Sequence, residues 1–507
     1  MRHIILILCV LVFASVNALG QIFSTPIRVN FEKTLNANRS PMMHLDRSGN
    51  IYIAWVLGGS GNTNGAIYIN VSTDGGMTFE PEVSVCADAH ANSDFQRTAQ
   101  FVIDTKGTLH MVWVGNRVNN QPDVWYVRSS DAGKTWTQPV TLCDADDSSK
   151  YAQDFAAIAC DSSDNLYASW LDSREVQRKT STNVHLYFSR SSDGGKTWST
   201  NKKTDMLPGG IGGTCECCSQ KIAASPNGHV YIVFRSDIPN GVNDIRDMWL
   251  ERSNDGGTTF EPALKIMTGD WNINACPVSG PNLTLDDSEG AHIVWRDARD
   301  DSNGVSHTYY AYVPNGSTVT PQNIAFDADG SQMSNYPDIA LFDHGTYRAI
   351  VYQSTNYGLR YILSNDLTAT RLVNNRPAPT GGGAGFGTVL FANDGTRYLS
   401  WQAQNGSDPA DIFFSRETMP LTSASVSTVH STLTFSLYPN PASGEIRISY
   451  SITAPSLVRM IDLLGREVYR TILLPNAKEM NISSENLPSG VYHCLLAAEE
   501  RVLIVQH

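Results

Sequence analysis

The sequence predicts an all-β protein, in which repeated four-stranded units form a β-propeller that is followed by a small β-sandwich. One phrase recurs seven times at spacings of 50 to 64 residues: a strand, a turn with Asp or Gly, and an apolar strand whose last residue is usually aromatic. Two further strand-like runs separate successive copies. Only 17% of the residues are charged, which counts against a coiled coil or a disordered chain. The seven copies end at Trp55, Trp113, Trp170, Phe234, Trp295, Val351 and Trp401.

The propeller is expected to span residues 22–418 and to have seven blades. Residues 23–30 (FSTPIRVN) would supply the outer strand of the last blade, whose own sequence stops after residues 411–417 (DIFFSRE). Closure of this kind removes open sheet edges. Two of the copies are degenerate, so six blades are the alternative.

The N-terminus reads as a secretory signal peptide over residues 1–20. A basic start is followed by an apolar run at residues 4–13, and Val16 and Ala18 are small residues suited to a cleavage site. No other stretch reaches 18 apolar residues, so no transmembrane span is expected in the mature chain. Export would place the remaining cysteines in an oxidising compartment.

A second repeat, S-x-D-x-G-x-x-(W/F), lies inside four of the units. Asp can accept backbone N–H bonds in a tight turn and Gly can adopt a positive φ, so we expect a structural role. The pattern resembles the Asp-box, or bacterial neuraminidase repeat, of sialidase-type propellers. Sialidases usually have six blades, so seven copies depart from that family. The four repeats occupy Ser72–Phe79, Ser129–Trp136, Ser191–Trp198 and Ser253–Phe260.

The C-terminal part is predicted to be a separate β-sandwich. Residues 419–432 are rich in Ser and Thr and read as a linker, and residues 433–507 contain short alternating apolar runs split by turn residues. Four phrases in this part resemble the sorting domain of the type IX secretion system. The resemblance implies contact with that secretion machinery and passage across the outer membrane to the cell surface or the medium. The phrases are Tyr438–Pro441, Asp462–Arg466, Leu487–Tyr492 and Arg501–Ile504.

A ligand pocket is expected over the central channel, on the face opposite the Asp-box turns. Arginines gathered there could grip a carboxylate or sulfate through charge-assisted bonds. The alternative is that neighbouring aspartates neutralise them in a structural network. The candidates are Arg39, Arg97 and Asp154 at the starts of the first strands, with Asp172, Arg174, Asp297 and Arg299 on loops of the same face.

The resemblance to sialidases also implies a tyrosine nucleophile and an acidic partner, for which Tyr336 and Asp154 are the candidates. However, Asn38–Pro41 matches the family's F/Y-R-I-P motif only at Arg39 and Pro41, and the loop after Trp55 lacks the aspartate that the family uses as general acid. We therefore expect a secreted or surface protein that binds an anionic glycan or protein at the channel mouth. An exo-sialidase or related glycoside hydrolase is the alternative. No cofactor is expected, and a net charge of −13 disfavours nucleic acid as a partner.

Four cysteines are expected near one end of the channel: Cys215, Cys217 and Cys218 before the fourth unit and Cys276 before the fifth. They could form disulfides that join two blades, or bind a soft metal such as copper or zinc. The oxidising compartment favours disulfides, but the sequence does not give their pairing.

Overall fold

The structure is a computed structural model that describes residues 23–505 with internal gaps. The predicted signal peptide, the predicted linker, Arg97 and Cys276 lie outside the described residues. The gaps are residues 32–35, 59–64, 92–98, 117–121, 145–150, 182, 211, 242, 274, 276, 302–303, 326–332, 356–357, 365–370, 374–383, 405–408, 418–433, 440–441, 452–455, 463–466, 474–478, 484–486 and 497–498.

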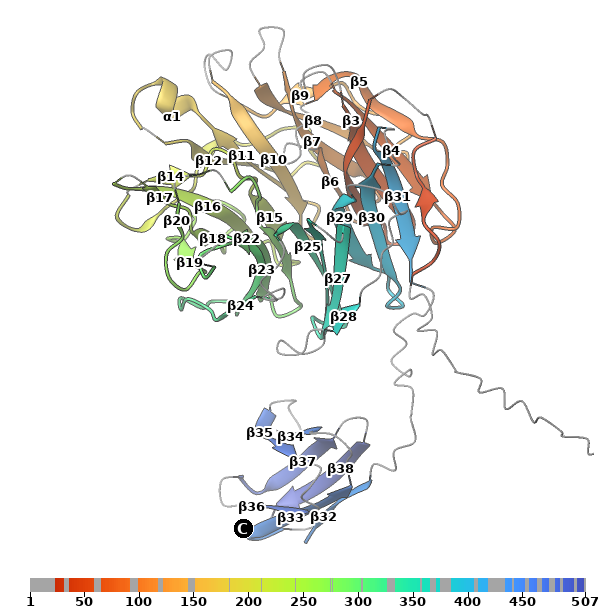
Figure 1. The fold of residues 1–507 in the computed structure, drawn as a ribbon, viewed down its shortest axis with the longest axis vertical. Helices are drawn as coiled ribbons and strands as arrows, with labels where there is room; N and C mark the ends of the chain where they lie inside the picture. Colours follow the sequence, from red (N-terminus) through yellow and green to blue (C-terminus); the bar gives the residue numbers. More distant parts are fainter. Residues whose placement is uncertain are drawn as a thin grey trace, which may run out of the picture. The chain divides into compact units, whose positions relative to one another are not determined.

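The chain divides into two compact units, Met1–Leu421 and Thr422–His507, which are described separately. In the described part of the first unit, the strands fall into seven antiparallel four-stranded sets (Figure 1). Among the described residues, helix is confined to the short α1 (Arg174–Gln177) and to a 3-10 turn at Pro208–Gly210. The predicted all-β propeller is therefore confirmed.

The first three sets come from the N-terminal part of the chain. The first two sets are joined through a single residue pair, Ala91 with Gly115. Their strands are β2 (Asn38–Leu45), β3 (Ile51–Leu57), β4 (Gly65–Ser72) and β5 (Val83–Ala91), then β6 (Gln100–Ile103), β7 (Leu109–Asn116), β8 (Pro122–Ser129) and β9 (Val140–Thr141), then β10 (Gln153–Cys160), β11 (Leu166–Asp172), β12 (His185–Ser191) and β13 (Lys202–Lys203).

The next three sets follow in chain order. The fourth set is extended by three short strands, β14 (Gly213–Thr214), β17 (Asn243–Ile245) and β20 (Asn272–Ile273). The strands of the three sets are β15 (Lys221–Ala224), β16 (Val230–Asn240), β18 (Met248–Ser253) and β19 (Leu264–Lys265), then β21 (Asn282–Leu285), β22 (Ala291–Asp297), β23 (His307–Val313) and β24 (Asn323–Ala325), then β25 (Ser334–Phe342), β26 (Tyr347–Ser354), β27 (Gly358–Ser364) and β28 (Arg371–Val373).

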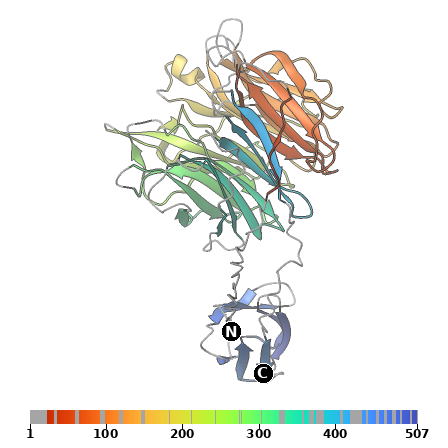
Figure 2. The same cartoon turned by 45° about the vertical axis from the view of Figure 1, so that its right-hand side comes forward.

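The last set closes the ring with a strand from the other end of the unit. It contains β29 (Gly385–Phe391), β30 (Arg397–Ala403) and β31 (Asp411–Arg416), and β1 (Ile27–Arg28) pairs with β31. Figure 2 shows the blue β31 strand beside the red strands of the N-terminal part. The closure expected from residues 23–30 is confirmed, and β31 is not left as an open edge.

The anchors that end each repeated phrase form the interior of the propeller. All seven are at most 2% exposed, because each lies on the second strand of its set, between neighbouring sheets. Large aromatic side chains at this position bury much apolar area per residue and set the spacing of the sheets. The residue that recurs in the sequence is thus the residue that packs between neighbouring sheets in each set.

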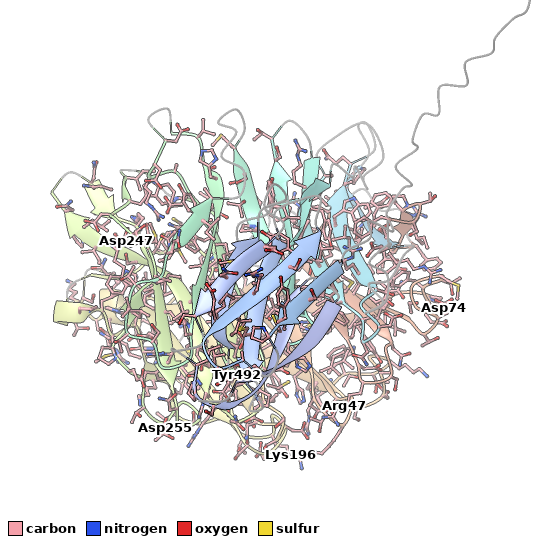
Figure 3. All side chains as sticks on the ribbon, turned by 90° about the horizontal axis from the view of Figure 1, so that it is seen from below. Arg47, Asp74, Lys196, Asp247, Asp255 and Tyr492 are labelled. Carbon is pink, nitrogen blue, oxygen red and sulfur yellow. The ribbon has the colours of Figure 1, made fainter. Side chains whose placement is uncertain are left out.

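The Asp-box turns are local hydrogen-bonded structures. In the second one, the Asp131 carboxylate accepts bonds from the Thr135 N–H (2.9 Å), the Thr135 hydroxyl (2.6 Å) and the Ser129 hydroxyl (2.8 Å). These bonds lower the pKa of Asp131 to about 2. Figure 3 labels the aspartates of two other boxes, Asp74 and Asp255, at the outline of the propeller. The predicted structural role of the boxes is confirmed.

A glycine in the third Asp-box has a specific reason to be glycine. Gly195 has a φ of 77°, and a Cβ on it would overlap the ring of Tyr126. The turn therefore packs against the neighbouring blade as well as folding on itself.

The second unit is a two-sheet β-sandwich, as predicted. One cluster of buried side chains, including Ile446, Met460 and Tyr492, joins the two sheets. Tyr492, labelled in Figure 3, also donates to the Pro488 carbonyl at 2.6 Å. The sheets are β32 (Thr434–Tyr438), β33 (Glu445–Ser451) and β36 (Glu479–Ser483), and β35 (Glu467–Leu473), β34 (Ser456–Asp462), β37 (Gly490–Leu496) and β38 (Glu499–Val505).

Among the described residues, no helix has the length and apolar character needed to cross a membrane.

Candidate functional site

The first strands of several sets begin with the same backbone irregularity. The strand register shifts at this point in β2, β10, β25 and β29. At each shift one residue that is not glycine has a φ between 50° and 52°. A bulge of this kind re-aims a side chain, and its repetition shows that the fold imposes it. The four residues are Ser40, Phe155, Tyr336 and Phe386.

These residues stand at one end of a central channel of about 280 Å³, which the first strands of all seven sets line. We call this end the channel mouth. It consists of Ser40, Phe155, Ser219, Gly280, Tyr336 and Phe386.

The channel wall carries charged and polar groups. Lys221 donates to the Gln100 side chain at 3.3 Å, and Asp338 accepts bonds from Thr388 and from the Val389 N–H, both at 2.9 Å. Burial lowers the pKa of Lys221 and raises that of Asp338, although their mutual attraction opposes both shifts. The channel wall therefore combines these polar groups with apolar residues such as Met43 and Ile339.

An aromatic pair forms one side of the channel mouth. The rings of Tyr336 and Phe386 have centroids 4.2 Å apart and are tilted by 34°. Both side chains are half-buried, so part of each ring is accessible. The Tyr336 N–H donates to the Ser279 hydroxyl at 3.3 Å, which ties this bulge to the neighbouring blade.

Two of the predicted polar residues adjoin the channel mouth. Arg39 directly precedes Ser40 on β2 and is half-buried, and Asp154 directly precedes Phe155 on β10. The Asp154 carboxylate accepts the Phe155 N–H at 3.1 Å. The third predicted member, Arg97, lies outside the described residues.

The predicted loop residues form two equivalent buried ion pairs. Arg174 contacts Asp172 at 2.8 Å, and Arg299 contacts Asp297 in the same way two blades further on. Each aspartate also accepts a bond at 3.2 Å from the indole N–H of the anchor tryptophan two residues before it. The guanidinium groups stack on tyrosine rings, at 4.1 Å and 4.6 Å. Both arginines are thus partnered inside the protein, and neither is among the residues that line the channel.

The structure adds two arginines that the sequence analysis missed. Arg235 and Arg296 follow the anchors Phe234 and Trp295, at a position where the other sets carry uncharged residues. Arg235 donates to the carbonyls of residues 246 and 296, at 2.8 Å and 2.7 Å, and Arg296 donates to that of Pro277 at 2.6 Å. Neither forms an ion pair with a carboxylate among the described residues.

Arg296 is not among the residues that line the channel; it lines a separate pocket together with Trp271 and Arg299. It interacts electrostatically with Tyr336, and burial lowers the pKa of its guanidinium group. The Nε atom of Arg296 is buried without a hydrogen-bond partner. A basic residue directly after an anchor was the signal in the sequence that could have revealed it.

The cysteines before β15 form a tight turn. The Cys215 N–H donates to the Arg235 carbonyl at 2.8 Å, and the Cys218 N–H donates back to the Cys215 carbonyl at 3.3 Å. This turn brings the sulfur atoms of Cys215, Cys217 and Cys218 within 4.8 Å of one another. Cys215 and Cys218 are free and buried. Cys217 is disulfide-bonded, to a partner that is not among the described residues.

The two free thiols, Cys215 and Cys218, have their pKa values shifted in opposite directions. Burial alone would raise the pKa of the Cys218 thiol, but a hydrogen bond from Cys215 and the charge of Arg235 outweigh this effect and lower the pKa below its usual value. The same hydrogen bond and burial raise the pKa of Cys215.

The solved structures to which this chain is similar have low sequence identity and TM-scores below 0.5. A protein of unknown function from Dyadobacter fermentans has a TM-score of 0.46 at 13% identity, over 78% of this chain and 98% of its own. An α-L-arabinanase from Penicillium chrysogenum has a TM-score of 0.46 at 12% identity, over 79% and 97%. A Hadza microbial sialidase has a TM-score of 0.41 at 13% identity, over 70% and 74%. No curated protein matches the sequence significantly.

Two family models match separate parts of the sequence. Residues 49–289 match the BNR repeat-like domain, which agrees with the Asp-box resemblance. Residues 436–506 match the secretion system C-terminal sorting domain, which indicates type IX delivery to the cell surface or beyond. The chain thus carries a BNR repeat-like propeller followed by a secretion system C-terminal sorting domain.

Proposed function

We propose that the channel mouth binds an acidic glycan, a saccharide that carries carboxylate or sulfate groups, and that the protein does so at the cell surface or in the medium. The observation that supports this most is the ring pair of Tyr336 and Phe386 at the channel mouth, together with the electrostatic interaction between Tyr336 and Arg296. Aromatic faces accept the apolar face of a sugar ring, while a few placed polar groups fix its orientation. An arginine near them can bind a carboxylate or sulfate group through bidentate hydrogen bonds.

The charges near the channel mouth favour an anion in spite of the acidic chain. Arg296 donates only to a backbone carbonyl, so its charge is not cancelled by a described carboxylate. Arg39 adds a second guanidinium group on another blade. A charge-assisted hydrogen bond contributes about 1.5–3 kcal/mol. Arg174 and Arg299 are left out of this site because aspartates already partner them.

Replacing Arg39 with alanine should weaken binding of an acidic oligosaccharide by about 10- to 100-fold, which is the loss of one such bond. Titration calorimetry with uronic-acid, sulfated and sialylated oligosaccharides measures the effect. The matched control is Arg47→Ala, because Arg47 lies in the exposed turn between β2 and β3, at the other end of the same strands, and is labelled at the outline of the propeller in Figure 3. Equal affinities for the two variants would contradict the proposal.

Tyrosine variants separate binding from catalysis. Tyr336→Phe keeps the ring and should keep most of the affinity, whereas Tyr336→Ala should lose it. A fluorogenic sialoside tests turnover in the same samples. If sugar is released and Tyr336→Phe abolishes the release, the protein is a glycoside hydrolase and the binding proposal is wrong.

Delivery rests on the sorting domain. Deleting residues 433–507 should trap the propeller in the cell envelope, because the signal that the secretion machinery recognises is then missing. Immunoblots of medium, surface-protease-treated cells and envelope fractions follow the protein. As a control, residues 419–507 fused to a periplasmic reporter should carry that reporter to the surface. Normal surface delivery of the truncated chain would refute this assignment.

A further inference from the structure

The turn at residues 215–218 has a local structure that the glycan proposal does not use. Cys215 and Cys218 are separated by two residues, a spacing common in thiolate metal sites. Their side chains are 0% and 1% exposed, and their sulfur atoms lie within 4.8 Å of each other. We propose that Cys215 and Cys218 bind one monovalent soft metal ion, Cu(I), between their two sulfur atoms.

The geometry of the pair suits one ion with two ligands. Metal–thiolate bonds are about 2.3 Å long, so two sulfurs bound to one ion are at most about 4.6 Å apart. The sulfurs of this turn lie within 4.8 Å of one another, which is close enough for both to reach one ion. The backbone bond from Cys218 to Cys215 closes the turn and holds both sulfurs on the same side. Cys217 lies 3.3 Å from the Cys215 sulfur but is engaged in its disulfide, so it is not required as a ligand.

The donor set selects the kind of metal. The cluster contains sulfur only: no histidine or carboxylate among the described residues joins it. Thiolates prefer Cu(I), whereas Zn(II) completes four ligands that this pair does not supply. The lack of solvent exposure also protects Cu(I), since it limits access of water and oxidants.

The charge around the pair points to a monovalent ion. Two thiolates and one Cu(I) carry a net charge of −1. Arg235 lies beside Cys218, donates only to backbone carbonyls and is fully buried, so it supplies the matching positive charge. Arg246, also nearby, is already paired with Glu216 at 3.2 Å and Asp244 at 3.1 Å.

The test is a Cu(I) titration of the complete protein under argon, in competition with the chelator bicinchoninate. We expect one Cu(I) per chain and a near-ultraviolet thiolate-to-copper absorption band. Cys215→Ser and Cys218→Ser should each weaken binding by about 100-fold or more. Cys160→Ser is the control, because Cys160 is a free thiol elsewhere in the propeller, on β10, and should leave binding unchanged.

A second readout needs no variant. In the copper-loaded wild-type chain, X-ray absorption at the copper edge should show two sulfur ligands at about 2.3 Å. Cu(I) binding that survives both serine substitutions would overturn the proposal. So would a Cys215–Cys218 disulfide in protein purified from the medium that persists when Cu(I) is present during expression, because the pair would then be a structural crosslink.

Discussion

Replacing Phe23 with alanine should lower the free energy of unfolding of the propeller by about 3–5 kcal/mol, the usual loss for a buried phenylalanine. Phe23 is 2% exposed and meets the ring of Tyr361 edge-on, with centroids 5.2 Å apart. It also pairs with Glu417 through the backbone, directly beyond the last strand of the ring. The substitution keeps this backbone pairing but removes the side-chain packing beside it. Urea denaturation followed by tryptophan fluorescence measures the change.

A second phenylalanine in the same segment provides the control. Phe31 is 51% exposed, so Phe31→Ala should change stability by less than about 0.5 kcal/mol. If both substitutions had the same small effect, closure by the N-terminal segment would not stabilise the ring. The result also matters for removal of the predicted signal peptide. Cleavage near Ala18 or Gly20 would retain Phe23, whereas cleavage a few residues later would remove it.

The fold was predictable because each blade repeats the same sequence pattern of apolar strand residues and turn residues. Buried tryptophans such as Trp55 and Trp295 mark the second strand in five of the seven sets, and the repeat spacing identifies the other two anchors, Phe234 and Val351. The Asp-box is a local structure, so its residues report its geometry directly. Pairing of β1 with β31 connects residues almost 390 positions apart, yet it followed from counting strands in the last unit.

The candidate site was less predictable because side-chain partners depend on tertiary contacts. Arg174 and Arg39 look equivalent in the sequence as basic residues on one face. Only the structure shows that Arg174 is held by Asp172, although the repeated W-x-D-x-R spacing was a sign of a structural pair. The backbone bulge that aims Tyr336 and Phe386 leaves no local sequence mark, since neither residue favours a positive φ.

The fourth set contains a buried glutamate, Glu251, whose ionised form is destabilised by its surroundings. Glu251 on β18 is 0% exposed, and burial together with the charge of Asp205 raises its pKa to about 8. Its Oε1 accepts the Met206 N–H, while Oε2 has no hydrogen-bond partner. Asp205 is also buried and accepts bonds from His185 at 2.9 Å and from Thr214 at 3.0 Å. Two buried carboxylates thus lie close enough to repel each other, and a proton on Glu251 relieves their repulsion.

Glu251→Gln should therefore stabilise the propeller at alkaline pH. In the wild type, the folded state keeps a proton on Glu251 up to about pH 8, whereas the unfolded chain releases it near 4.5. The folded state binds more protons across that window, so wild-type stability falls as pH rises from 4.5 to 8 and is level above it. Glutamine is neutral throughout and escapes this loss, which is on the order of 4 kcal/mol. Urea denaturation at pH 5, 7 and 8.5 should show the variant gaining on the wild type with each step.

The same substitution on an exposed glutamate of this set isolates the effect of burial. The Glu261 side chain is 43% exposed and pairs with Arg252 at 3.1 Å, so Glu261→Gln should change stability by less than about 1 kcal/mol at each of these pH values. A parallel gain in both variants would trace the effect to the net charge of −13 rather than to the buried site. A Glu251→Gln protein that is less stable than the wild type at pH 8.5 would mean that Glu251 is ionised in the folded state and that its carboxylate is needed there.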